Sequence, residues 1–358
     1  MGSATASTPP CYRSHMNYFK TLPVALLLVV AVPVASANAV VEWELKDDSV
    51  SLGMNGVSPH VEKTASGDRV FRSDMVPAGT AVSMCNDAGS CSSETLNVTG
   101  SPISDFALAT TPSGVRAYFK RIDMASNTQA VYSAACNDAN CLSFGSATIA
   151  STGMQVSKDT KAWGVPDPVR LPDGRVRIYI VESPSLGTSC PEKVASYISS
   201  DGISFTKESG WRLENGYVDT EVLRAKDGDW VMIMADGPGC TSASGARKVQ
   251  QLYVSTSTDG LSWAKPQLLT STDVGRLDPT GYEVSPNVFR IYYAAGGSDN
   301  NFSIKRATMR IKDTAASGGV GVTKTAPGKS KSKSITCVKG KTVRKVSGTT
   351  CPKGFKKK

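Results

Sequence analysis

Histidine is nearly absent from this 358-residue chain, which contains only two, at positions 15 and 60. A serine–histidine–carboxylate triad needs one well-placed histidine, and multi-histidine metal sites need several. His15 lies in a segment that we expect to be removed, so only His60 remains and the sequence argues against both kinds of site. No Cys-x-x-Cys pair occurs either, which argues against zinc sites and thioredoxin-like redox sites.

A long apolar run is also missing. The most apolar stretch covers residues 22–34, which is shorter than the roughly 20 residues of a membrane-spanning helix. It follows Lys20 and precedes Ala35-Ser36-Ala37, which has the form of a signal-peptide cleavage site. We therefore expect residues 1–39 to be an N-terminal extension and signal peptide, with Met16 as the true start, and the protein to be secreted. An uncleaved N-terminal anchor is the alternative.

Acidic residues are missing from the C-terminal end. Residues 324–358 contain twelve Lys or Arg and no Asp or Glu. The region 40–323 contains 26 basic and 31 acidic residues, so the high isoelectric point belongs to the tail. This distribution argues against a nucleic-acid-binding domain, which carries its basic residues on the fold. We expect residues 313–334 to be a flexible linker and 335–358 a basic tail. The tail suits an anionic cell-wall or membrane surface, and a merely solubilising role is the alternative.

Nine cysteines are present, and Cys11 precedes the expected start. An even number of cysteines in an exported chain indicates disulfides. Proximity in the sequence predicts the pairs Cys85–Cys91, Cys136–Cys141, Cys337–Cys351 and, by elimination, Cys190–Cys240.

The body of the chain has no long apolar stripe of helical period. It has short β-rich runs separated by Gly, Asp, Pro and Ser, which is typical of an all-β fold. The runs recur as units that open at Ser58, Asp105, Asp167, Asp219 and Asp278. Four of these units end in a hairpin tip that contains an aspartate, at Asp87, Asp138, Asp201 and Asp259.

The distances from opening residue to tip aspartate are 29, 33, 34 and 40 residues. Each unit holds about four strands, as a propeller blade does. The last unit lacks a tip, and a strand near 41–45 would complete it and close the ring. We therefore predict an all-β, five-bladed β-propeller with four-stranded blades over residues 40–312. A β-sandwich with coincidental turns is the alternative.

The tips at 199–205 and 257–263 resemble the Asp-box hairpin of sialidase-type propellers, in which the aspartate bonds the turn and an aromatic residue packs between sheets. The number and order of blades resemble the five-bladed glycosidases of the arabinanase and fructosidase type. The C-terminal piece resembles Lys-rich tails of secreted actinobacterial proteins, which have no established role.

The glycosidase resemblance implies that catalytic acids lie where the inner strands begin, around a central funnel. It maps Asp105, Asp167, Asp219 and Asp278 to these openings. Glu221 lies two residues after Asp219 and therefore shares its face of the strand. Such a cluster could supply the ionised base and the protonated acid of glycoside hydrolysis. Structural capping of turns is the alternative for each single aspartate.

Four further residues are candidates for substrate binding. Hairpin geometry suggests that Glu182 lies near Asp167 and that Asp236 lies near Asp219. Trp163 and Tyr282 flank the openings of two units and could stack on sugar rings or pack between blades. Long loops that contain Cys190 and Cys240 are expected on the same face, where a disulfide would join them beside the carboxylates.

Two departures from the family weaken the prediction of an enzyme. The first unit opens with Ser58-Pro59-His60 where the family has its base aspartate, and Glu221 is the nearest match to the family's general acid. We therefore predict a monomeric, secreted, glycosidase-like propeller that acts on extracellular carbohydrate. A non-catalytic carbohydrate-binding or cell-envelope scaffold is the alternative. No cofactor or metal is predicted, although a structural or funnel calcium ion stays open.

Overall fold

The computed structural model describes residues 41–75, 78–98, 102–160, 163–183, 191–225, 227–237, 249–296 and 301–312. It also describes the backbone of 334–339, 342–347 and 356–357. The predicted signal peptide and residues 313–333 of the predicted linker lie outside the described residues. In the described part of the chain, no helix is long and apolar enough to cross a membrane.

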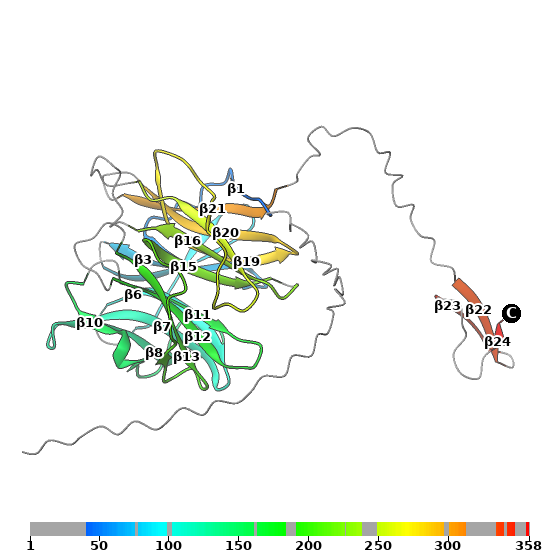
Figure 1. Ribbon diagram of the computed structural model, residues 1–358, viewed down its shortest axis with the longest axis horizontal. Coiled ribbons are helices and arrows are strands. Elements are labelled where there is room, and N and C mark those ends of the chain that lie inside the picture. The colour runs from blue at the N-terminus through cyan, green and yellow to red at the C-terminus, as the bar shows by residue number, and fades with distance from the viewer. Residues whose placement is uncertain are drawn as a thin grey trace, which may run out of the picture. The chain divides into compact units, whose positions relative to one another are not determined.

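The fold is an all-β, five-bladed propeller, as predicted (Figure 1). The first blade contains β2 (Val57–Thr64), β3 (Gly67–Met75), β4 (Ala78–Cys85) and β5 (Cys91–Glu94). The second contains β6 (Ile103–Thr111), β7 (Gly114–Asp123), β8 (Thr128–Ala135), β9 (Thr148–Ile149) and β10 (Gln155–Ser157), with a 3₁₀ turn, η1 (Thr152–Met154), between the last two. The third contains β11 (Gly164–Arg170), β12 (Val176–Glu182), β13 (Lys193–Ser199) and β14 (Thr206–Lys207). The fourth contains β15 (Tyr217–Arg224), β16 (Trp230–Asp236), β17 (Leu252–Ser257) and β18 (Gln267–Leu268).

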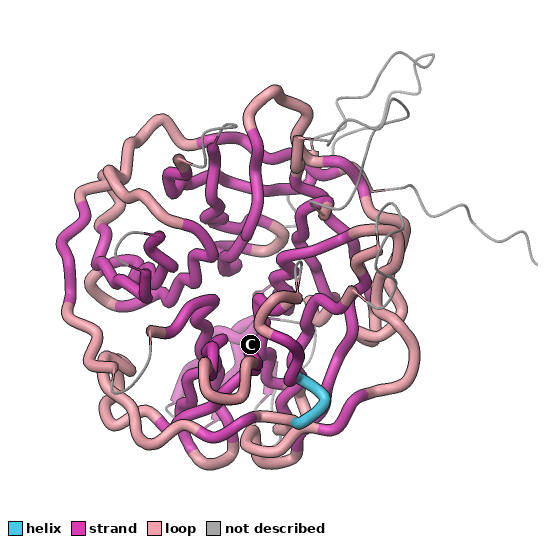
Figure 2. The backbone as a smooth tube through the Cα atoms, turned by 90° about the vertical axis from the view of Figure 1, so that its left-hand side faces the viewer, coloured by secondary structure: helices cyan, strands magenta, loops and turns pink. Residues whose placement is uncertain are grey.

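The fifth blade joins the two ends of the propeller. It contains β19 (Gly275–Ser285), β20 (Val288–Gly296) and β21 (Phe302–Ile311), and its outer strand is β1 (Trp43–Asp47) from the start of the described chain. Strand β1 pairs antiparallel with β21, and Trp43 lies opposite Ile311. The predicted closure of the ring by the N-terminal strand is therefore confirmed. Figure 2 shows the strands arranged around a common centre.

The hydrophobic core is divided among the five contacts between neighbouring blades. Each of five buried clusters contains side chains from two adjacent blades. Tyr118 and Tyr197, for example, lie in the cluster between the second and third blades. Alternate residues of each strand face the two neighbouring blades, because side chains of a strand alternate between its faces. This packing places the first strand of every blade at the centre of the ring.

The hairpin tips join one blade to the next. The Asp259 carboxylate accepts hydrogen bonds from the backbone N–H groups of Leu261 and Ser262, at 2.7 and 2.8 Å. The carbonyl of Gly260 accepts a hydrogen bond of 2.7 Å from the Tyr179 hydroxyl of the preceding blade. Gly260 has a φ of +69°, and a Cβ there would lie 2.9 Å from that hydroxyl oxygen. These contacts give the tip aspartates a structural role.

The basic C-terminal region contains a three-stranded sheet of its own. Its strands are β22 (Ser334–Lys339), β23 (Thr342–Ser347) and β24 (Lys356–Lys357), in the order β23-β22-β24. The sequence analysis did not predict these strands, because the high density of Lys masks the short alternation around Val338 and Val343.

Candidate functional site

Each inner strand of the propeller has a bulge at the same place. The pairing with the second strand is interrupted between Val57 and His60 in the first blade, and at the corresponding point in the other four. The first residue of each bulge has a positive φ, between 46° and 53°. These residues form what we call the upper ring: Ser58, Asp105, Val165, Asp219 and Asp278.

The bulges correct the predicted alignment of the third blade. Asp167 was matched to Asp105, Asp219 and Asp278, but the residue at the equivalent position is Val165. Asp167 pairs with Tyr179, as Glu221 pairs with Ile233 in the next blade. The mismatch arose because the sequence alignment used the aspartates themselves as markers. The residues two positions after the upper ring form the lower ring: His60, Ala107, Asp167, Glu221 and Thr280.

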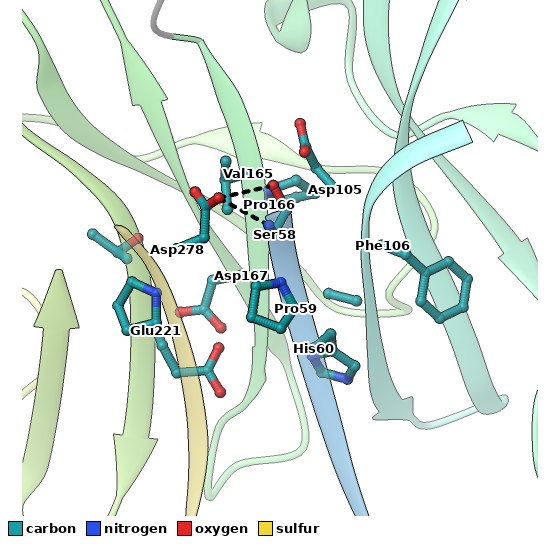
Figure 3. Close-up of a pocket in the computed structure, with 13 residues that line it drawn as sticks. Ser58, Pro59, His60, Asp105, Phe106, Val165, Pro166, Asp167, Glu221 and Asp278 are labelled. Atoms are coloured by element: carbon teal, nitrogen blue, oxygen red, sulfur yellow. Dashed lines mark hydrogen bonds between the residues drawn. The ribbon is translucent and has the colours of Figure 1, made fainter. Parts of the chain in front are cut away.

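Asp219 and Asp278 of the upper ring form a hydrogen-bonded pair of carboxyl groups. Burial, followed by the charge and the hydrogen bond of Asp278, raises the pKa of Asp219 well above its usual range. Burial also raises the pKa of Asp278 to about 6, although the N–H of Ser58 donates to its Oδ2 at 2.8 Å and lowers it. Figure 3 shows this contact. Two carboxyl groups in contact cannot both ionise easily, so the pair holds one proton to a higher pH than a lone aspartate would.

Asp105 lies in a different electrostatic setting. Its Oδ2 is 2.5 Å from Nζ of Lys120, which projects from the second strand of the same blade. Burial lowers the pKa of Lys120, but the charge of Asp105 and the hydrogen bond to it outweigh burial and leave that pKa raised. Neutral positions, Ser58 and Val165, separate Asp105 from the Asp219–Asp278 pair on both sides of the ring. The upper ring therefore combines an ion-paired carboxylate with a proton-sharing pair.

The lower ring joins neighbouring blades. Its acceptors bind a backbone N–H of the following blade: Leu108 donates to His60 at 3.1 Å, Val222 to Asp167 at 2.7 Å, Gly281 to Glu221 at 3.1 Å and Val61 to Thr280 at 3.3 Å. At the fifth position the acceptor is replaced by Ala107 and the donor by Pro168, which has no N–H. The missing pair lacks both partners, so no buried backbone donor is left unpaired there.

The lower-ring carboxyl groups are also protonated easily. Burial raises the pKa of Glu221 to about 7, against the charge of His60 and the hydrogen bonds from Gly281 and Thr280, which lower it. Burial and the charge of Glu221 raise the pKa of Asp167 well above its usual range, and the Val222 N–H lowers it. His60 Nε2 is also 3.0 Å from Oε1 of Glu62. This nitrogen accepts the Leu108 N–H when it is unprotonated, and donates to Glu62 when it is protonated.

Two cavities are lined by residues of the rings. A cavity of about 180 Å³ at the start of the inner strands, which we call the mouth cavity, is lined by Asp219, Asp278, Gln250 and several apolar side chains. A second cavity, of about 20 Å³, lies among the residues of both rings (Figure 3), and that volume holds about one water molecule. Asp167 and Glu221 line only the second cavity. A substrate in the mouth cavity would therefore meet Val165, Asp219 and Asp278 of the upper ring, whereas Asp105 lines the second cavity.

Of the other predicted binding residues, Trp163 lines the mouth cavity, whereas Glu182, Asp236 and Tyr282 line neither of the two cavities. Trp163 is buried between blades but also lines the mouth cavity. Glu182 accepts hydrogen bonds from Tyr197 and Lys207, and lies three positions beyond Tyr179, the residue opposite Asp167. The predicted placement of Glu182 beside Asp167 is therefore wrong, because Asp167 lies three residues inside its strand and not at the start of it.

Asp236 and Tyr282 have structural contacts. Asp236 lies opposite Tyr217, near the start of the fourth inner strand, and its carboxylate accepts the Gln251 N–H at 2.5 Å. The Tyr282 hydroxyl donates to Asp68 at 2.6 Å, and its ring packs between the fifth and first blades. For Tyr282, packing between blades replaces the predicted sugar contact.

Two of the predicted disulfides are present, Cys85–Cys91 and Cys136–Cys141. Both close the tip of a blade. Cys190, Cys240 and Cys351 lie outside the described residues, and so does the side chain of Cys337. In the described part, no three His, Cys, Asp or Glu side chains converge as a metal site would require.

Sequence reasoning missed Lys120, Val165 and Gln250 as residues of the site. Lys120 lies in the second strand of its blade, and no motif marks a lysine that reaches the ring centre from there. Val165 could have been found by aligning the Pro that follows it with Pro59 and Pro279, which also follow upper-ring residues.

A scan against protein-family models finds no match for this chain, and a search of curated proteins also finds none. Solved structures do resemble it. A thermostable family-43 glycoside hydrolase has a TM-score of 0.55 at 12% identity, over 77% of this chain and 98% of that chain. An endo-arabinase from Bacteroides thetaiotaomicron has a TM-score of 0.55 at 12% identity, over 74% and 99%. An N-acetylgalactosamine deacetylase from F. plautii has a TM-score of 0.51 at 13% identity, over 71% and 89%. At these identities the similarity establishes the fold, a five-bladed propeller whose similar structures include glycoside hydrolases.

Proposed function

We propose that this protein is a glycosidase-like hydrolase that cleaves extracellular carbohydrate at the mouth cavity. The observation that carries the proposal is the upper ring, in which the Asp219–Asp278 carboxyl pair lines the mouth cavity. The ion-paired carboxylate of Asp105 lies just behind that lining, with its Oδ2 3.5 Å from where a Cβ of Gly164 would stand. Glycoside hydrolysis needs such a combination, a carboxylic acid and a carboxylate on either side of the scissile bond. The glycoside hydrolases among the similar structures support the proposal through the fold alone.

The roles follow from the electrostatics of each residue. Asp219 would donate its proton to the glycosidic oxygen, because its pKa is held well above the usual range by burial and by Asp278. Asp105, paired with Lys120 at 2.5 Å, would act as the base that activates water or as the nucleophile. Asp278 would hold Asp219 protonated. Asp167 and Glu221 would join blades and take no direct part in the reaction.

The test is hydrolysis of a panel of 4-nitrophenyl glycosides and soluble polysaccharides by the purified protein, beside Asp105→Asn and Asp219→Asn. Asp201→Asn, in a hairpin tip, is the matched control. We expect release by the parent and the control, and a loss of at least about 100-fold in both upper-ring variants, the usual contribution of an acid or base. Inverted products would identify Asp105 as a base, and retained products as a nucleophile.

One observation favours a second candidate, a carbohydrate-binding propeller without catalysis. The first blade has Ser58 at the position where the resemblance to the five-bladed glycosidases implies an aspartate. The N–H of Ser58 donates a hydrogen bond to Asp278. Sugar binding without release of product from any member of the panel would establish this candidate and end the hydrolase proposal.

We also propose that the protein acts outside the cell. The two disulfides of the described chain support this location, because disulfides persist in oxidising compartments. The basic C-terminal sheet would then hold the propeller at an anionic surface by charge.

A further inference from the structure

Val165 has an unusual backbone conformation. Its φ is +51°, in the left-handed region. A β-branched residue is rarely found there, whereas Asp and Asn tolerate the region well. The equivalent residues in the other blades are Ser58, Asp105, Asp219 and Asp278, all polar. Such strain persists only when the surroundings enforce it, and it is concentrated at functional sites.

The surroundings of Val165 form one wall of the mouth cavity. Trp163, Val165, Val181, Val218 and Leu277 line this cavity, and its polar lining is Asp219, Gln250 and Asp278. Val165 also lines the second cavity, so it lies between the two cavities. Trp163, Val181 and Val218 are buried, while Val165 and Leu277 are half-buried. Trp163, Val165 and Val181 come from the third blade, whereas both carboxyl groups come from the fourth and fifth blades, so the third-blade side of the cavity is apolar.

A sugar with hydroxyl groups on every side would meet this wall poorly. A hydroxyl group that is buried without a partner loses the hydrogen bonds that it made with water. A methyl group loses nothing there and gains contact with the apolar side chains. A carboxylate or another anionic group on the sugar would face a cavity that already contains Asp219 and Asp278.

We propose that Val165 determines specificity for a sugar that carries a methyl group, placed against this apolar wall. The methyl group could belong to a 6-deoxyhexose or to the acetamido group of an N-acetylhexosamine. This inference rests on the proposed function only in placing a sugar in the mouth cavity, and it requires no catalysis.

The test measures binding, so it does not depend on hydrolysis. Affinities are determined by calorimetry for two matched pairs. The first is methyl D-fucoside against methyl D-galactoside, which differ only at C6, and the second is N-acetylglucosamine against glucose. We expect the methyl-bearing member of one pair to bind at least about tenfold more tightly, the discrimination that one methylene-sized group brings in an apolar pocket. The pair that shows the preference identifies the source of the methyl group.

Two variants connect the preference to Val165. Val165→Thr keeps the branched shape and the strain but adds a hydroxyl, so we expect it to lose most of the tenfold preference. Val165→Asn suits the left-handed conformation, so we expect it to lose the preference while its midpoint of thermal unfolding rises. Val284→Asn, at an exposed valine in the fifth inner strand, is the control and should leave the preference unchanged.

Equal affinities within both pairs, or no binding of any of the four sugars, would overturn the inference. A preference that survives in Val165→Thr would overturn it as well. Hydrolysis without a methyl preference would leave the proposed function intact and remove only this inference. A methyl preference in a protein without hydrolytic activity would support this inference and remove the proposed function.

Discussion

At the scale of single residues, Lys120 compensates the negative charge of Asp105 in the upper ring. It is the cation that the structure places against Asp105, with a separation of 2.5 Å, and Asp105 is only 7% exposed. Removal of one partner from a buried ion pair leaves the other charge without compensation.

We therefore expect Lys120→Met to lower the free energy of unfolding by about 3 kcal/mol. The comparison is Lys158→Met, which removes the half-buried lysine of the 2.7 Å pair with the exposed Asp159 and should change stability by less than about 0.5 kcal/mol. Chemical denaturation of both variants measures the difference, and equal effects would show that Asp105 does not depend on Lys120.

The raised pKa values of the ring carboxyl groups make stability depend on pH. Glu221 retains its proton up to about pH 7 in the folded protein, and Asp278 up to about pH 6, whereas an unfolded chain releases such protons near pH 4. Between these values the unfolded chain binds fewer protons than the folded protein. The free energy of unfolding should therefore fall as the pH rises from about 4 to 7.

Glu221→Gln isolates the contribution of one group to this fall. The shift of about 2.5 pH units corresponds to roughly 3 kcal/mol, at 1.36 kcal/mol for each unit. We expect the variant to lose about that much less stability than the parent between pH 4.5 and pH 8. Urea unfolding at several pH values provides the comparison, and parallel curves for the two proteins would contradict the account.

The identity of the upper-ring acids could be predicted from the sequence in part. Asp105, Asp219 and Asp278 were identified because each opens a repeat unit. Asp167 was assigned two residues out of place, since the sequence shows an aspartate but not the bulge that displaces it. The electrostatic difference between Asp105 and Asp219 depends on Lys120, which reaches the ring from another strand and has no sequence signal.

At the scale of strands, the lower ring explains why the inner strands keep their positions relative to one another. Four of its five positions bind a backbone N–H of the next blade. At the fifth position Ala107 has no acceptor, and Pro168 of the next blade has no N–H to donate. Asp167 accepts the N–H of Val222 at 2.7 Å, and both residues are buried.

Asp167→Ala should lower the free energy of unfolding by about 2 kcal/mol, because it leaves that buried N–H without a partner. Asp167→Asn should retain most of the stability, since its amide oxygen accepts the same bond and the burial that raises the pKa of Asp167 favours a neutral side chain. Thermal unfolding distinguishes the two variants. If Asp167→Ala and Asp167→Asn lower the midpoint of thermal unfolding equally, the contact with Val222 is not how Asp167 stabilises the fold.

Strand order was more predictable than side-chain position. The turns and β-rich runs recur at similar distances, so the sequence indicated the blades and the closing strand. The pairing register inside a hairpin was not predictable, because a bulge adds residues without a change in composition. The incorrect placement of Glu182 beside Asp167 has another cause, because Asp167 was taken as the first residue of a strand that begins at Gly164.

For the whole molecule, closure of the ring depends on β1. Trp43 is 7% exposed, and its ring centre lies 5.9 Å from that of Phe289 in the fifth blade. Its backbone N–H and carbonyl both bond the side chain of Gln267 in the fourth blade. The strand therefore joins the fourth and fifth blades.

Trp43→Ala should lower the free energy of unfolding by about 4 kcal/mol, as expected for the loss of a large buried aromatic side chain. Val41→Ala, at a residue that is 49% exposed just before β1, should change it by less than about 0.5 kcal/mol. Denaturant unfolding of the two variants is the measurement. A small effect of Trp43→Ala would mean that the ring is closed without this strand.

The central claim for the whole molecule is that the upper ring is reactive and the lower ring is structural. The most direct test is kcat/KM of Asp219→Asn and Glu221→Gln on whichever glycoside the parent cleaves. We predict a loss of at least about 100-fold for Asp219→Asn, which removes the acid, and a loss of less than about tenfold for Glu221→Gln, which keeps the contact with Gly281. A Glu221→Gln variant as inactive as Asp219→Asn, or an Asp219→Asn variant with parental activity, would contradict the account.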